Sequence, residues 1–179
     1  MEVETLQRIP MSWEEYLALP APERTEWSHG IAIMSPPPSA HHGVVSANLV
    51  FALKLGLPGL RVMVEAGLKM EHSLRGPDVM VTRDLPTGPW VEASPVLVVE
   101  VLSPSTQSED LLRKAPEYAA AGVGQYWIVN RDYRTLEVHV LVDGHWELSA
   151  LFDKATPKGE VVVGDHGVVA IDLHDLLDG

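Results

Sequence analysis

The chain has 179 residues and a formal charge of −12, with 13 Lys and Arg against 25 Asp and Glu. It contains no cysteine, which excludes disulfide scaffolds, thiolate metal sites and cysteine nucleophiles. The length suits one domain over residues 1–179. The acidic balance argues against indiscriminate binding to polyanions, so a nucleic-acid partner would require local cations or metal ions.

Two features bear on the location of the protein. No stretch approaches the ~18 apolar residues of a spanning helix, so we expect no membrane association. The N-terminus, Met1 to Glu4, is acidic and lacks the basic start and apolar run of a signal peptide. We therefore expect a cytoplasmic protein.

The first third of the chain predicts a short helix, a hairpin and a longer helix. The segment Ser12-Trp13-Glu14-Glu15 is a capping box and predicts a helix over residues 13–19. Residues 26–34 read as a hairpin, with a glycine supplying the positive φ of its turn. A helix is predicted over residues 41–55, with Gly56 following it as the C′ residue.

The middle of the chain predicts several strands and one helix. Strands are expected over residues 60–64, 67–70, 78–81, 96–102 and 126–129. The run at 96–102 is apolar on both faces, which is typical of a central strand covered on both sides. A second capping box, Thr106-Gln107-Ser108-Glu109, predicts a helix ending near Gly122. Pro116 inside this helix should kink it or leave one backbone bond unmade.

The remaining third predicts a further hairpin. Asp143-Gly144 is a type I′ turn signal between strands over residues 135–142 and 145–151. From Glu160 onward we expect a short strand and a last helical turn. This order of elements predicts an α/β or α+β fold with a mixed sheet.

Glu100 is the most informative residue for function, because it is a carboxylate in the middle of an apolar strand. Burying an unpaired charge is costly, so Glu100 must be protonated, paired or bound to a cation. The alternatives are a side chain that reaches solvent and a structural pair with an arginine.

Asp78 is the second candidate, at the start of a strand directly after Pro77. A turn or capping role is the default for a Pro-Asp pair. Adjacent strands can nevertheless bring Asp78 and Glu100 within reach of one ion, and two hard oxygen ligands suit Mg²⁺ or Mn²⁺.

Asp110, Lys114 and Tyr118 form the third candidate group, because steps of four place them on one helical face. This face could instead be solvated, with Leu111, Leu112 and Ala115 forming the buried side.

Taken together, these residues resemble the Uma-type putative restriction endonuclease family. The resemblance covers residues from about 11 to 175. It is carried by Pro77-Asp78, by Val99-Glu100-Val101-Leu102-Ser103-Pro104-Ser105-Thr106, by Asp110 with Lys114 and Tyr118, and by Tyr126-Trp127-Ile128-Val129. Upstream, Met11 to Leu17, Glu26 before His29-Gly30, and Met34-Ser35-Pro36-Pro37 leading to His42 also match.

The resemblance implies the PD-(D/E)XK nuclease superfamily. The implied fold is a restriction-endonuclease-like mixed central sheet flanked by helices, with additional N- and C-terminal hairpins. It further implies that Asp78 and Glu100 hold Mg²⁺ (or Mn²⁺), with the Val101 backbone carbonyl as a further ligand. A lysine would assist the attacking water.

The chain departs from the family pattern in several places. Leu102 stands where the superfamily usually has its lysine, and family members carry a lysine at the position of Lys114. We therefore expect Asp78, Glu100 and Lys114 to be the catalytic residues. Secondary candidates are Glu26, His42, Asp110 and Tyr118. Milder departures are His29, Ile31 and Asn130, where Asp, Glu and Asp are usual.

Two functions remain open from the sequence. The first is a Mg²⁺-dependent nuclease that hydrolyses phosphodiester bonds of nucleic acid, with DNA as the expected substrate. The second is a non-catalytic nucleic-acid or protein interaction module that retains the nuclease fold, which Leu102 and the charge of −12 favour. We also expect a homodimer, because two active sites related by a two-fold axis match the two strands of a duplex. The apolar hairpin over residues 135–151 is the expected contact surface.

Overall fold

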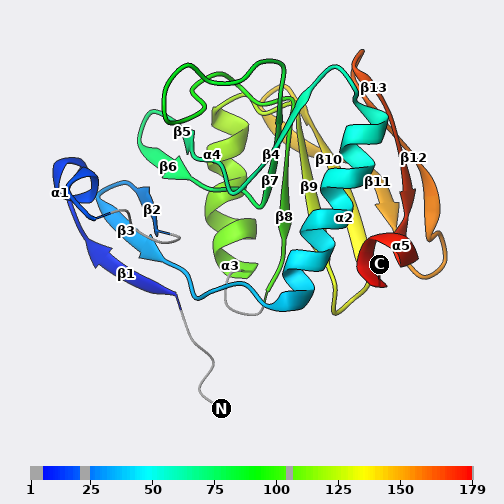
Figure 1. The fold of residues 1–179 in the computed structure, drawn as a ribbon, viewed down its shortest axis with the longest axis horizontal. Coiled ribbons are helices and arrows are strands. Elements are labelled where there is room, and N and C mark those ends of the chain that lie inside the picture. The colour runs from blue at the N-terminus through cyan, green and yellow to red at the C-terminus, as the bar shows by residue number, and fades with distance from the viewer. Residues whose placement is uncertain (1–5, 21–24, 104–106, 179) are drawn as a thin grey trace.

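A computed structural model of the protein describes residues 6–20, 25–103 and 107–178. Its centre is a six-stranded sheet with the strand order β11-β10-β9-β8-β7-β4 (Figure 1). The strands are β4 (Arg61–Val64), β7 (Val79–Thr82), β8 (Leu97–Val101), β9 (Gln125–Asn130), β10 (Thr135–Val142) and β11 (His145–Phe152). β8 and β9 pair in parallel, and the other neighbours pair antiparallel. The mixed central sheet expected from the sequence is confirmed.

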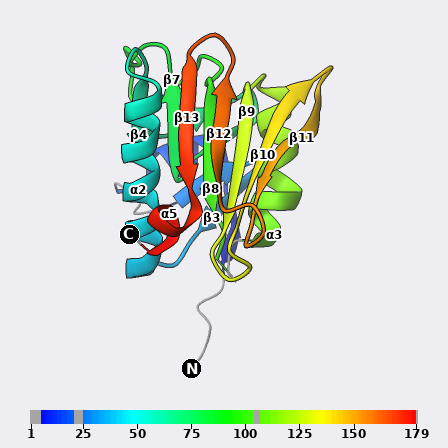
Figure 2. The same ribbon diagram turned by 90° about the vertical axis from the view of Figure 1, so that its right-hand side faces the viewer.

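Helices cover both faces of this sheet (Figures 1 and 2). One face packs against α2 (Ala40–Gly56), the hairpin of β12 (Lys158–Val163) and β13 (Gly167–Asp172), and α5 (Leu173–Asp178). The other face packs against a helical segment made of α3 (Gln107–Glu109), the π-helical turn η1 (Asp110–Lys114) and α4 (Ala115–Ala120). Val99 of β8 lies in the core on the α2 side, whereas Val98 lies with Tyr118 on the α4 side. The same alternation directs Glu100 toward α4.

None of the helices in the described ranges combines the length and the apolar composition that spanning a bilayer requires.

A second, five-stranded sheet is built from the N-terminal part of the chain. It contains β1 (Gln7–Pro10), β2 (Thr25–Ser28), β3 (Ile31–Met34), β5 (Leu68–Lys69) and β6 (Ser73–Arg75) in the order β1-β3-β2-β6-β5. The predicted β2–β3 hairpin is present, but β1 and β6 were not predicted. Every residue of β1 is exposed, so the strand has no apolar alternation, and Pro10 is tolerated at the sheet edge.

The short helix α1 (Trp13–Leu17) precedes β2 and has the predicted capping box. The Ser12 hydroxyl accepts a hydrogen bond from the Glu15 amide, and the Glu15 carboxylate accepts one from the Ser12 amide.

The tail also differs from the prediction, because it forms the complete hairpin β12–β13 as well as α5. The β10–β11 hairpin is as predicted, with positive φ at both Asp143 and Gly144.

The helix predicted over residues 106–122 is interrupted by η1, and Thr106 of its expected capping box lies outside the described residues. Pro116 has no amide to donate to the carbonyl four residues earlier. The preceding turn widens instead, so that the Ala115 amide donates to the Asp110 carbonyl. The expected kink is therefore replaced by a π turn. The alternative in which Leu112 is buried is wrong, because Leu112 is 74% exposed while Asp110 and Lys114 are buried.

Gly56 has a different role from the one expected, because it lies inside α2, and Leu57 is the cap with φ of −129°. A Cβ on Gly56 would lie 2.6 Å from the Val168 carbonyl oxygen and 2.8 Å from the Val169 Cα. Glycine therefore allows α2 to lie directly against β13.

Replacing two glycines of α2 by alanine should have opposite effects on stability. Gly56→Ala forces backbone atoms of β13 away and should lower the free energy of unfolding by about 1–3 kcal/mol. Gly43→Ala is the matched control, because its Cβ would meet nothing within 4 Å. It should raise the free energy of unfolding by about 0.5–1 kcal/mol through helix propensity. Urea unfolding checks both values, and a stabilising Gly56→Ala would contradict the close packing.

Candidate active site

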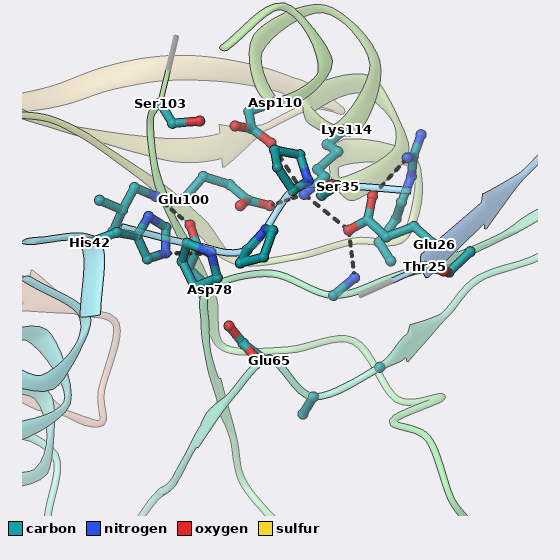
Figure 3. Close-up of a pocket in the computed structure, with 18 of the residues that line it drawn as sticks. Thr25, Glu26, Ser35, His42, Glu65, Asp78, Glu100, Ser103, Asp110 and Lys114 are labelled. Atoms are coloured by element: carbon teal, nitrogen blue, oxygen red, sulfur yellow. Dashed lines mark hydrogen bonds and ion pairs between the residues drawn. The ribbon is translucent and has the colours of Figure 1, made fainter. Parts of the chain in front are cut away.

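The two candidate metal carboxylates lie close together, with Asp78 directly before β7 and Glu100 in the neighbouring strand β8 (Figure 3). Val79 of β7 pairs with Val99 of β8 in antiparallel register. One step further along this register lie Asp78 and Glu100, and opposing residues of an antiparallel pair point to the same face. Asp78 is 8% exposed and Glu100 is 1% exposed. The β7–β8 ladder thus brings both carboxylates to the α4 face of the sheet.

Glu100 is held by two side chains of the helical segment. The Tyr118 hydroxyl donates to Glu100 Oε1 at 2.6 Å, and Lys114 Nζ donates to the same oxygen at 3.1 Å. Burial raises the pKa of Glu100 well above its usual range; the Lys114 charge opposes this rise, and nearby carboxylates add to it. Among the described residues, no hydrogen bond reaches Glu100 Oε2. The Glu100 side chain therefore neither reaches solvent nor pairs with an arginine of the described chain. It is buried and paired with a lysine.

Lys114 lies at the centre of three carboxylates. Its Nζ is 3.0 Å from Glu26 Oε1, 3.1 Å from Glu100 Oε1 and 3.2 Å from Asp110 Oδ1. Burial alone would lower the pKa of Lys114, but the negative charges around it, above all Glu100 and Glu26, raise this pKa well above its usual range. The side chain is therefore a buried ammonium, which cannot serve as a general base.

Asp78 is held by one side chain and one backbone amide. His42 Nε2 lies 3.0 Å from Asp78 Oδ1, and the Val101 amide donates to Asp78 Oδ2 at 2.7 Å. Burial acts to raise the pKa of Asp78, but the hydrogen bond and charge of His42, with Lys114 and the Val101 amide, hold this pKa below its usual value. His42 is placed by the first turn of α2, where the Ser39 hydroxyl accepts from the His42 amide. Asp78 is therefore kept ionised.

The structure also reveals Arg75, which the sequence reading missed. Arg75 is 1% exposed, and its Nε and Nη2 donate to both oxygens of Glu117, each at 2.7 Å. Its Nη1 donates to Glu109 Oε1 at 2.9 Å and to Glu26 Oε2 at 3.0 Å. The three carboxylates raise the pKa of Arg75 even though burial acts to lower it. Glu26 therefore links the Arg75 guanidinium to the Lys114 ammonium.

The sequence gives little indication that Arg75 is buried and paired with carboxylates. Strand β6 is three residues long and lies between the turn at His72 and Gly76-Pro77, so it has no readable periodicity. Nothing in such a polar, turn-rich stretch indicates that its arginine is fully buried.

These residues surround a cleft of about 640 Å³ (Figure 3). Seven of the eight predicted site residues line it: Glu26, His42, Asp78, Glu100, Val101, Asp110 and Lys114. The eighth, Tyr118, is fully buried and reaches Glu100 from the core. The Val101 carbonyl remains a predicted ligand, since the contact that the structure shows there involves the Val101 amide.

The donor set of Asp78 and Glu100 fits a hard divalent cation. Within the described part of the chain, no group of three or more His, Cys, Asp or Glu side chains is arranged to hold a metal ion. Mg²⁺ is commonly bound by one or two carboxylates, with waters and substrate phosphates in the remaining positions. Two carboxylates of which one, Asp78, is kept ionised are consistent with such a site.

Arg75→Met should both weaken the fold and change its pH dependence. Removing one partner of a buried ion pair costs about 3–5 kcal/mol. In the wild type, burial acts to raise the pKa of Glu117, but Arg75 lowers this pKa below 4.5. The Arg75–Glu117 pair therefore stabilises the protein at neutral pH. This stabilisation is lost only as the pH falls through the lowered pKa of Glu117. In the variant the buried carboxylates bind protons more readily than in the unfolded chain, so stability should rise from pH 7 to about pH 5.

Urea unfolding at the two pH values measures this effect, with the exposed Arg61→Met as the control. If the variant were as stable as the wild type at pH 7, Arg75 would not be needed to stabilise the buried carboxylates of Glu26, Glu109 and Glu117.

The chain is similar to known proteins both in sequence and in fold. The family model described as "Uma2: Putative restriction endonuclease" matches residues 13–173. Among solved structures, a "putative nuclease belonging to DUF820" from Anabaena variabilis ATCC 29413 has the same fold, with a TM-score of 0.77, 20% identity, and 94% of this chain and 98% of that chain covered. A search of curated proteins finds no match. Because the family model spans most of the chain, the protein belongs to the Uma2 family of putative restriction endonucleases.

Proposed function

We propose that the protein is a metal-dependent nuclease that hydrolyses phosphodiester bonds of nucleic acid, with DNA as its substrate and Mg²⁺ or Mn²⁺ as its cofactor. The observation that carries this proposal is the position of Lys114 Nζ, 3.1 Å from Glu100 Oε1. The chain has Leu102 two residues after Glu100, and Leu102 packs against the apolar cluster on the α4 side. Lys114 supplies from the helical segment the cation that Leu102 cannot supply.

Asp78 and Glu100 would hold the metal ion, with the Val101 carbonyl as a further ligand. When bound, the ion supplies Lewis acidity toward a phosphate oxygen and toward water. His42 and the Val101 amide hold the Asp78 carboxylate in one orientation, and Tyr118 does the same for Glu100. The side chains that would bind the ion are thus positioned before it binds, which lowers the cost of binding.

Lys114 would stabilise charge in the transition state. Because its pKa is raised, the ammonium stays protonated and can act on the negative charge that develops on the phosphate. Glu26 and Asp110 hold it beside the cleft at 3.0 Å and 3.2 Å. Proton abstraction from water therefore falls to a group other than Lys114.

The alternative is a non-catalytic interaction module that retains the nuclease fold. The charge of −12 and Leu102 support it. The close grouping of Lys114, Glu26 and Glu100 opposes it, because a buried charge cluster is costly to keep without a use.

We also propose a homodimer. The β10–β11 hairpin supports it, because β11 is an edge of the central sheet and exposes Leu148 and Leu151, which are 55% and 44% exposed. Light scattering at micromolar concentration should give twice the chain mass of 19.6 kDa. A value near that of one chain would contradict the proposal.

Cleavage assays on Lys114→Met test the nuclease proposal. Loss of one preorganised charge donor typically costs about 10²–10³ in rate, so we expect cleavage of DNA in Mn²⁺ to fall by that factor. Lys154→Met is the control, because Lys154 is exposed and does not line the cleft. It should leave the rate unchanged.

Calorimetry with Mn²⁺ separates the role of the lysine from that of the carboxylates. Glu100→Gln should weaken Mn²⁺ binding at least about tenfold, or 1.4 kcal/mol, whereas Lys114→Met should retain it. A wild-type protein that binds Mn²⁺ but cleaves neither DNA nor RNA would favour the interaction module.

A further inference from the structure

The connector between β3 and α2 forms part of the wall of the cleft. Pro36, Pro37 and Pro38 line the cleft, and consecutive prolines form a stiff, extended segment. Figure 3 shows the connector at Ser35 passing across the cleft from the side of Glu26 to the side of His42. A strand that reaches Asp78 and Glu100 would therefore lie beside this connector.

The depth of the site limits what can reach it. The side chains proposed to act on the phosphate are almost fully buried, with Asp78 8%, Glu100 1% and Lys114 6% exposed. A duplex is stiff over about 50 nm and carries its phosphates on the outside of a wide rod. A single strand can bend and enter a narrow cleft.

The charges of the cleft also disfavour a duplex. Of the cations that line it, Arg75 and Lys114 are buried in ion pairs. Arg131 is exposed at the rim, and within the described chain no carboxylate pairs with it. The carboxylates that line the cleft are Glu26, Glu65, Asp78, Glu100, Asp110 and Asp132.

Among the described residues, the other lysines and arginines do not line the cleft. Lys69 Nζ lies 5.7 Å from the centroid of the Trp90 ring, but it is paired with Glu92. In the β4–β7 ladder, Val64 pairs with Val79, which lies next to Asp78 of the site. Arg61 pairs with Thr82 at the other end of this ladder, away from the site. Duplex-binding proteins commonly make about 6–10 phosphate contacts. The rim of this cleft offers one.

The cleft wall offers flat apolar surfaces in place of charge. Trp90 lines the cleft and is held in place by Trp13, with ring centroids 5.7 Å apart. It packs against Gly67, where a Cβ would lie 2.7 Å from Trp90 Cδ1. Bases stack on such rings whatever their sequence.

We propose that the cleft binds a single-stranded segment of nucleic acid, with bases against Trp90 and the Pro36–Pro38 connector and one phosphate on Arg131, and that an intact duplex does not enter. This rests on the proposed nuclease function and names the form of its substrate.

Binding and cleavage of matched oligonucleotides test the proposal. The probes are a labelled DNA strand of about 16 nucleotides and its blunt duplex. Binding is followed by fluorescence anisotropy in Ca²⁺, and cleavage is followed in Mn²⁺. The single strand should bind and react at least about tenfold better than the duplex. One phosphate contact on a single strand gives a slope of about −0.7 in log K against log salt, and this is the slope that we expect.

Three variants test the assigned contacts. Arg131→Ala should remove about 0.7 from the salt slope, while Arg61→Ala at the opposite end of the sheet should change nothing. Trp90→Ala should weaken single-strand binding about fivefold or more, and Trp90→Phe should retain most of it. Pro37→Gly makes an exposed part of the connector flexible and should reduce the preference for single strands.

The outcomes separate this proposal from the nuclease proposal. Equal or better binding and cleavage of the duplex, or a salt slope of about −4 or steeper, would overturn the single-strand assignment and leave the nuclease standing. Selective binding of the single strand without cleavage in any divalent metal would support the assignment and contradict the nuclease. Binding of neither probe would overturn the assignment.

Discussion

The burial of negative charge is the constraint on which the rest of this structure depends. Glu26 is shared between two buried cations, with one oxygen 3.0 Å from Lys114 Nζ and the other 3.0 Å from Arg75 Nη1. Through this carboxylate, the N-terminal sheet and the helical segment against the central sheet form one electrostatic unit. Few carboxylates in a protein interior can stay ionised unless cations are fixed beside them. β2, β6 and the helical segment supply Glu26, Arg75 and Lys114 to this arrangement.

Sequence patterning predicted the parts of the fold in which burial imposes a regular period. The run at Val96–Leu102 is apolar on both faces, and it became the central strand β8. The capping box at Ser12 and the Asp143-Gly144 turn were also readable, because each depends on residues close together in the sequence. Strands β1 and β6 were missed because they are short and lack alternation.

The candidate site was predictable for a different reason. Glu100 stood out because a charge inside an apolar strand needs an explanation, and the register with Asp78 follows once β7 and β8 pair. The spacing of four residues grouped Lys114 with Asp110 and Tyr118, and the family resemblance implied its role. Arg75 could not be found in this way, because its burial depends on Glu109 and Glu117, which are distant in sequence and meet it only in the folded chain. Long-range ion pairs leave no local pattern.

The π turn η1 carries Lys114 on an element separate from the strand that carries Glu100. Asp78 and Glu100 are tied to a rigid ladder, so their relative position is set by strand pairing. Lys114 comes from a different element, and what matters is the point in space that its ammonium occupies. An inserted residue in a helical turn rotates all later side chains by about 100°. A protein can therefore supply the cation from a helix instead of a strand and retain the same arrangement of charges. A sequence motif that requires a constant spacing between the carboxylate and the lysine does not detect such a site.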